Sequence, residues 1–220
     1  MKNSSNKKKS FFLLIGVMMM VAVMRVPFTA IPAVLTDIAA GLGVSVSDLG
    51  ILTSLPLVMF ALCSSLAPGW AARLGLEKLL GLALLVMTAG SLLRIVGVAG
   101  LFLGTILIGI SVAIINVLLP SLVSVHFPLK VGLYTTVYIT MMGLAGTVGS
   151  MVAVPIVEAS SWQTFVILLT LFVGLAALIW LPNWSYNHRF EQASKTTKQG
   201  SLLKNKAALI FGSLSTVVGR

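Results

Sequence analysis

The chain has few charged residues, and most of them are basic. Only 9% of its 220 residues are charged, with five acids against 15 lysines and arginines. A soluble domain carries about 25% charged residues, so this chain cannot cover itself with a polar surface. Its single cysteine, Cys63, excludes a disulfide within the chain and a metal site built from several cysteines. Glycine-rich phosphate loops and histidine–glutamate zinc motifs are also missing, so we predict no enzyme, no cofactor and no metal.

Long apolar runs take the place of charge, and 58% of the chain is hydrophobic. A helix needs about 20 apolar residues to cross ~30 Å of hydrocarbon. The runs are continuous, whereas the strands of a membrane barrel alternate in polarity over about 10 residues. We therefore predict an all-α integral membrane protein with six transmembrane helices, at residues 11–36, 49–71, 77–98, 101–125, 132–157 and 162–182.

The polar segments divide the chain into four parts. Residues 1–10 are polar and are expected to form a disordered cytoplasmic tail before the six-helix unit of residues 11–182. Residues 183–206 are polar and basic, which indicates a cytoplasmic linker. The apolar pattern resumes over residues 207–220 and predicts the start of a seventh, truncated helix. Six helices, a linker and a new span are typical of the N-terminal half of a transporter built from two six-helix halves.

The basic residues are sorted by position along the chain. Twelve of the 15 lie before the first span, in alternate connections, or after the sixth span, whereas the remaining connections carry only Asp48 and Glu158. Short loops rich in lysine and arginine stay on the cytoplasmic side, so we predict a cell-membrane protein with a cytoplasmic N-terminus. The same charges suit anionic lipid head groups. The partners that we expect are therefore the lipid bilayer and a small-molecule substrate, with no nucleic acid.

Arg25 is the sharpest candidate for function, because it lies near the middle of the first run. A central arginine costs about 2.5–3.5 kcal/mol to insert, so it should face a cavity or a partner. Thr29 follows four residues later on the same helix face. Pro27 and Pro32 free carbonyl groups and bend the helix. These residues predict a site for an anion or an electron-rich polar solute, and the alternative is a structural arginine bonded to helix carbonyls.

Two further polar residues are candidates for the same pathway. Asn116 lies midway along the fourth run, and its amide can both donate and accept hydrogen bonds. Tyr138 shares a face of the fifth run with Tyr134, which offers hydroxyl donors. Interhelical hydrogen bonding is the equal alternative for Asn116. For the tyrosines, and above all for Tyr134, the alternative is an aromatic side chain at the membrane interface.

Other features of the spans have mainly structural interpretations. Gly143, Gly146 and Gly149 give the fifth run a surface of small residues, which predicts close helix packing; a sliding contact would use the same residues. Arg94 lies near the outer end of the third run, where we expect its side chain to reach the membrane surface; the alternative is that it guards the outer entrance for anions. All five acids lie at span ends or in connections, so this half offers no mid-membrane acid for a proton relay.

Three stretches resemble the cyanate and nitroimidazole transporter branch of the major facilitator superfamily. Residues 24–35 read MRVPFTAIPAVL and resemble the first-helix arginine of that branch with the threonine and proline that follow it. Residues 67–78 read APGWAARLGLEK and are similar to the signature loop of the superfamily. Residues 104–128 begin GTILIG, contain NVLLP at residues 116–120, and resemble the fourth helix of the branch.

The resemblance implies a secondary transporter that moves a small anion or polar solute, such as cyanate or a nitroimidazole, by alternating access. On this analogy Arg25 and Asn116 face the substrate, while Arg73 and Gly75 belong to a cytoplasmic gate. The signature loop usually has an aspartate where this chain has Ala72, and the fifth run lacks the Gly-Pro pair of the antiporter motif. A full member has twelve helices, so the cavity needs a C-terminal half or a partner chain.

Two alternatives from other functional classes remain. The chain could be an inactive truncated fragment that inserts into the membrane without transporting. It could also be a half-size membrane scaffold or subunit that needs a partner half to complete a pathway. About six further spans after residue 220 would exclude the half-size interpretation.

Overall fold

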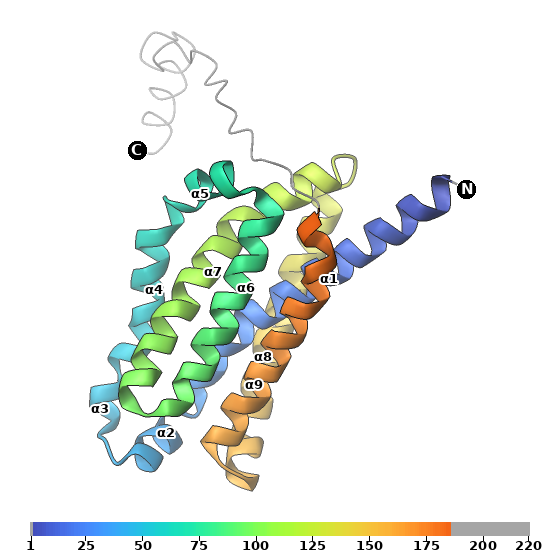
Figure 1. Cartoon of the computed structure of the whole chain (residues 1–220). Helices are drawn as coiled ribbons and strands as arrows, with labels where there is room; N and C mark the ends of the chain where they lie inside the picture. The colour runs from blue at the N-terminus through green and yellow to red at the C-terminus, as the bar shows by residue number, and fades with distance from the viewer. Residues whose placement is uncertain (1, 186–220) are drawn as a thin grey trace, which may run out of the picture. The chain divides into compact units, whose positions relative to one another are not determined.

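The computed structural model describes the backbone of residues 2–185 and the side chains of residues 13–184. Every regular element in this part of the chain is helical (Figure 1). The elements are, in order, α1 (Lys2–Ala33), α2 (Leu35–Leu42), α3 (Val46–Leu49), α4 (Ile51–Ser64), α5 (Ala67–Leu74), α6 (Leu76–Leu93), η1 (Arg94–Val96), α7 (Val98–His126), α8 (Val131–Ala159), α9 (Trp162–Trp180) and η2 (Leu181–Ser185).

Six helical segments in the described residues are long and apolar enough to cross a membrane. Their lengths run from 19 to 29 residues, and about 20 residues suffice for the hydrocarbon core. The prediction of six transmembrane helices in an all-helical fold is confirmed. The segments are Leu13–Ala33, Val46–Ser64, Leu76–Val96, Val98–His126, Val131–Ala159 and Trp162–Trp184.

The ends of two predicted segments differ from the structure. Helix α1 begins at Lys2, so the expected disorder of residues 1–10 is wrong for residues 2–10. Lysine is a good helix former, and a polar turn can extend a helix beyond the apolar span. The second predicted run, residues 49–71, is divided because α4 ends at Ser64 and α5 begins at Ala67. Pro68 lies in the first turn of α5, where a proline favours the start of a helix.

The predicted linker also begins later than residue 183. The short helix η2 continues α9 through Leu181–Ser185, and the side chain of Asn183 is buried. Trp184 packs against Gly81 of α6, which attaches these residues to the helical unit. The rest of the linker and the predicted seventh helix, residues 207–220, lie outside the described residues.

Two sets of helices form the bundle. Helix α7 packs along α6 on one side and α4 on the other, while α1 packs against α8 and α9 (Figure 1). Helix α6 also contacts α9, which joins the two sets. One apolar core lies between α1 and α9 and includes Val34, Trp162 and Val166. The arrangement places the middle of α1 close to both α7 and α8.

The closest crossing joins α6 to α7 through two glycines. A methyl group added at Gly104 would collide with the carbonyl oxygen of Gly90 and lie 2.8 Å from Cγ of Arg94. The side chain of Arg94 is therefore enclosed at 3% exposure, and its guanidinium donates a hydrogen bond of 3.1 Å to Thr105 Oγ1. The expectation that Arg94 reaches the membrane surface is wrong, because this crossing encloses its stem between the two helices.

Replacing Gly104 with alanine should lower stability, whereas the same change at Gly143 should not. Alanine favours a helix by about 1 kcal/mol over glycine at either position. At Gly104 the added methyl group forces α6 and α7 apart, and overpacking of this kind costs about 1–3 kcal/mol. A methyl group at Gly143 meets nothing within 4 Å. Thermal unfolding of the purified protein in detergent measures the difference, and equal midpoints for the two variants would contradict the close crossing.

Candidate functional site

A cavity of about 390 Å³ opens between α1, α4 and α7. It brings together Arg25 and Asn116, two residues that the sequence analysis selected from different spans. The arginine and the asparagine are the polar residues of the wall, and the others are apolar or aromatic. The lining residues are Met24, Arg25, Phe28, Leu57, Phe60, Val112 and Asn116.

Arg25 supplies the charge of this cavity. Its side chain is exposed, and its guanidinium carbon lies 5.9 Å from the centroid of the Phe28 ring. That distance is within the range of a cation–π interaction, which stabilises the guanidinium over the ring face. Among the described residues, no carboxylate forms a salt bridge with Arg25. The positive charge is therefore available to an anion or to an electron-rich group of a solute.

Asn116 supplies an amide on the opposite wall. Its Nδ2 donates a hydrogen bond of 3.1 Å to the carbonyl oxygen of Val112, one turn earlier on α7. The described residues give Asn116 no hydrogen bond to another helix, so the interhelical alternative gains no support. The remaining N–H and the carbonyl oxygen of the amide stay available for a polar solute. The substrate-facing role of Asn116 remains a prediction that this placement favours.

Thr29 and Tyr138 do not line the cavity. The hydroxyl of Thr29 lies 3.2 Å from the carbonyl oxygens of both Arg25 and Gly146, so it joins α1 to α8. Tyr138 is buried on α8, eight residues before Gly146, which corresponds to ~12 Å along a helix. The structure therefore brings Arg25 and Asn116 together without these two residues, and their substrate-binding roles stay predictions.

Arg73 and Gly75 lie at the junction of α5 and α6. Arg73 is exposed in the last turn of α5, and within the described part of the chain it forms no salt bridge. Gly75 has φ +94°, a backbone conformation that residues with a side chain rarely adopt, and it turns the chain between the helices. Ala72 is half-buried at the position where the resemblance leads us to expect an aspartate. The gate role of Arg73 and Gly75 stays a prediction.

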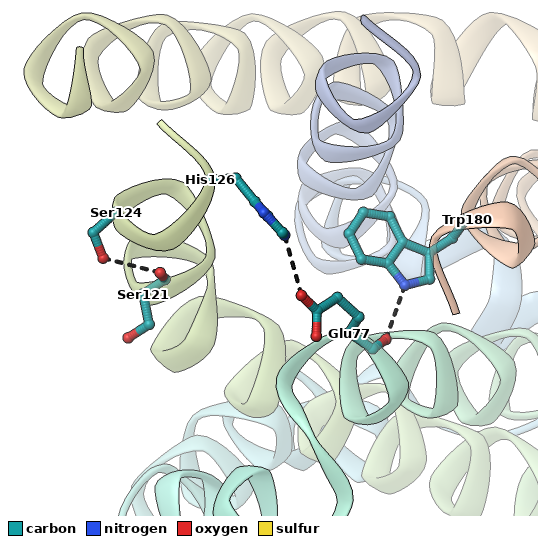
Figure 2. Close-up of polar contacts among 5 residues, drawn as sticks. All are labelled: Glu77, Ser121, Ser124, His126 and Trp180. Atoms are coloured by element: carbon teal, nitrogen blue, oxygen red, sulfur yellow. Dashed lines mark hydrogen bonds and ion pairs between the residues drawn. The ribbon is translucent and has the colours of Figure 1, made fainter. Parts of the chain in front are cut away.

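A second polar cluster lies at the end of the bundle where α6 begins and α7 ends (Figure 2). Glu77 is completely buried, and its Oε1 lies 3.1 Å from Nε2 of His126. The indole of Trp180 donates a hydrogen bond of 3.0 Å to the carbonyl oxygen of Glu77, which adds α9 to the junction. On α7, the Ser124 hydroxyl donates to the Ser121 carbonyl oxygen at 2.9 Å.

The sequence analysis placed Glu77 with the other acids at span ends or in connections and did not predict its pairing with His126. Two neighbouring antiparallel helices place the start of one beside the end of the other. Glu77 in the first turn of α6 and His126 in the last turn of α7 could therefore have indicated the pair. Within the described residues, no group of three histidine, cysteine or acidic side chains is arranged to hold a metal ion. The pair therefore joins helices, while the cavity of Arg25 is the candidate site for a solute.

Comparison with known families identifies the chain. Residues 11–219 match the Major Facilitator Superfamily. The chain belongs to the major facilitator superfamily. Its relatives include an uncharacterized transporter, YycB, of Bacillus subtilis (strain 168), which is 38% identical over 89% of this chain and 50% of the relative. A 2-nitroimidazole transporter of Escherichia coli (strain K12) is 38% identical over 82% of this chain and 47% of the relative.

The relatives and a solved structure show how much of a complete family member this chain covers. This superfamily member spans about half the length of the curated relatives that it matches. Both relatives are named as transporters, so the family is one of transporters rather than enzymes. The crystal structure of the peptide transporter POT in complex with alafosfalin has a similar fold, with a TM-score of 0.68 and 16% identity. That likeness covers 92% of this chain and 46% of the peptide transporter, and it concerns the fold alone.

Replacing Glu77 with alanine should destabilise this superfamily member much more than the same change at Glu158. Glu77 is buried against His126, whereas Glu158 is exposed near the end of α8. Removing the Glu77 carboxylate leaves the His126 ring without this contact, which costs about 1–3 kcal/mol. Removing an exposed carboxylate costs less than about 0.5 kcal/mol. Thermal unfolding in detergent compares the two variants, and similar losses at both positions would show that the pair does not stabilise the junction.

Proposed function

We propose that this chain is the N-terminal half of a secondary transporter that moves a small anion or polar solute across the cell membrane by alternating access. The observation that carries the proposal is the cavity between α1, α4 and α7, in which Arg25 and Asn116 face the same space. A charged residue inside a membrane span indicates a substrate or ion pathway by default. Membership of a transporter family supports that interpretation over a purely structural arginine.

The proposed pathway needs a second wall. Superfamily members bind substrate near the bilayer midplane between two six-helix halves. This chain spans about half the length of its curated relatives, and the spans containing α4 and α8 have only 17% of their residues buried. Large apolar residues of both helices are exposed, among them Leu57, Leu144 and Val148. A C-terminal half or a partner chain that covers these faces is therefore part of the proposal.

We orient the proposed half with its N-terminus in the cytoplasm. The lysines in the N-terminal part of α1, Arg73 and Lys78 at the junction of α5 and α6, and Lys130 between α7 and α8 support this orientation by the positive-inside rule. The orientation places the Glu77–His126 pair at the cytoplasmic end of the bundle and Arg94 at the outer end.

The cavity favours a flat solute with a polar edge. Arg25 and Asn116 offer a charge and an amide, whereas Phe28 and Phe60 offer ring faces on α1 and α4. A nitroimidazole suits both the polar and the aromatic residues of this wall. Its nitro oxygens can pair with the guanidinium while its ring stacks on a phenyl group. The Escherichia coli relative is named a 2-nitroimidazole transporter, which supports the same class. Cyanate is the second candidate, since it would use the charge of Arg25 without the rings.

Replacing Arg25 with alanine should reduce uptake of 2-nitroimidazole to background in cells that express the complete reading frame. Loss of the guanidinium removes the only charge that the described residues contribute to the cavity wall. Arg25→Lys should retain part of the uptake, because lysine keeps the charge and loses the planar fork that matches two oxygens. Initial uptake rates, normalised to the amount of inserted protein, measure the effect.

Two controls make the Arg25 experiment decisive. Membrane insertion should be equal in wild type and both variants, which separates a substrate role from a folding defect. Unchanged uptake by Arg25→Ala would contradict the proposal. Uptake by residues 1–220 expressed alone would support a half-size subunit that pairs with its own copy, whereas the proposal expects these residues alone to insert without uptake.

Replacing Phe60 with alanine should change the choice between the two solutes. Aromatic stacking contributes about 0.5–1.5 kcal/mol, so the KM for 2-nitroimidazole should rise roughly 2- to 12-fold. The KM for cyanate should change by less than about twofold, because a linear anion gains little from the ring. Phe172→Ala is the matched control, since Phe172 borders a separate apolar groove between α1, α8 and α9. Equal effects on both solutes would exclude a ring-stacking role for Phe60.

A further inference from the structure

Helix α8 approaches the aliphatic stem of Arg25 closely at Gly146. A methyl group added at Gly146 would lie 2.9 Å from Cγ of Arg25 and 3.6 Å from Cγ2 and Oγ1 of Thr29. Gly146 is buried, so the stem of Arg25 rests directly on the backbone of α8. Any larger residue at this position has to displace either the helix or the arginine.

Hydrogen bonds fix the two helices at the same point. The carbonyl oxygen of Gly146 accepts from Thr29 Oγ1 at 3.2 Å and from Ser150 Oγ at 3.1 Å. The Ser150 hydroxyl also lies 3.2 Å from the carbonyl oxygen of Thr29. The Thr29 hydroxyl lies 3.2 Å from the carbonyl oxygen of Arg25. Two hydroxyl groups thus connect the backbone of α8 to the turn of α1 that carries the arginine.

The contact limits where the guanidinium can go. Because the stem of Arg25 lies against α8 at Cγ, the rest of the side chain extends over Phe28 into the wall of the cavity. We propose that Gly146 is a positioning residue that sets the place of the Arg25 guanidinium and thereby the affinity of the cavity for its solute. This inference rests on the proposed function of Arg25 as the substrate-facing charge.

The same helix provides a matched control in Gly149. A methyl group added there would lie 2.7 Å from Cγ1, 3.0 Å from Cγ2 and 3.2 Å from Cβ of Val26, so it overpacks the same α1–α8 interface more severely than one at Gly146. Val26 is buried and does not line the cavity that contains Arg25. Substitutions at Gly146 and Gly149 therefore disturb one interface, and only the first displaces the arginine.

The test compares uptake kinetics of 2-nitroimidazole for Gly146→Ala and Gly149→Ala in the complete reading frame. Both variants should lower the thermal midpoint, Gly149→Ala at least as much as Gly146→Ala. Only Gly146→Ala should raise the KM, by about tenfold, which corresponds to a loss of about 1.4 kcal/mol in binding. Equal KM values for the two variants would overturn the positioning role and leave structural packing as the explanation.

A double-mutant cycle with Arg25→Lys isolates the pair. The flexible lysine stem can move away from an added methyl group, so Gly146→Ala should change the KM by less than about threefold in the lysine background. Gly149→Ala should change the KM equally little in both backgrounds. Additive effects of the changes at Arg25 and Gly146 would contradict the proposed coupling.

If Gly146→Ala does not reach the membrane, a second variant tests the positioning role instead. Thr29→Val keeps the volume of the side chain and removes the hydroxyl that bonds to the Gly146 carbonyl oxygen, so the KM should rise with Vmax unchanged. Thr147→Val is its control, because that hydroxyl bonds only within α8, to the Gly143 carbonyl oxygen at 3.0 Å. An unchanged KM for Thr29→Val would also overturn the inference.

The outcomes separate this inference from the proposed function. If Arg25→Ala leaves uptake unchanged, the proposed function fails and the positioning role fails with it. If Arg25→Ala abolishes uptake while Gly146→Ala behaves like Gly149→Ala, the proposed function stands and only the positioning role is lost.

Discussion

The cost of placing charge in hydrocarbon governs the interior of this bundle. A charged side chain in a membrane span needs a partner, a cavity or a route to the surface. The described spans meet this requirement in three ways. Glu77 pairs with His126, Arg94 is enclosed against Thr105, and Arg25 opens into a cavity beside Phe28. The third lines a cavity of about 390 Å³, which is why it is the candidate site.

Helix packing decides where each of these charges ends up. Lipid tails are as apolar as leucine, so helices in a membrane associate through close contact and hydrogen bonds rather than through apolar burial. The α6–α7 crossing at Gly90 and Gly104 encloses Arg94, and the α1–α8 crossing at Gly146 supports Arg25. Small residues therefore determine whether an arginine is enclosed or presented to a cavity. The backbone contact and the chemistry of the site are parts of one arrangement.

Much of the fold could be predicted from the sequence, because continuous apolar runs and the distribution of charge report directly on the membrane. The placement of Arg25 and Asn116 in one cavity could also be predicted, because polar residues near the middle of spans tend to face a shared interior. The enclosure of Arg94 and the burial of Glu77 could not be predicted in this way. Both features depend on which helices are neighbours and on how closely these helices approach each other. The hydropathy of a single segment gives no information on either point.

Among the described residues no carboxylate forms a salt bridge with Arg25, and this has a physical consequence for the proposed transport. A salt bridge within the described spans would satisfy the guanidinium permanently, and a solute would have to break that pair before binding. A cation–π contact with Phe28 stabilises the charge by only about 0.5–2 kcal/mol, so a solute can still gain from pairing with it. Affinity then stays moderate, which suits the proposed role of the cavity, because a transporter has to release its solute on the other side of the membrane. Under this proposal, the ring beside the arginine holds the charge in place between transport events without competing strongly for it.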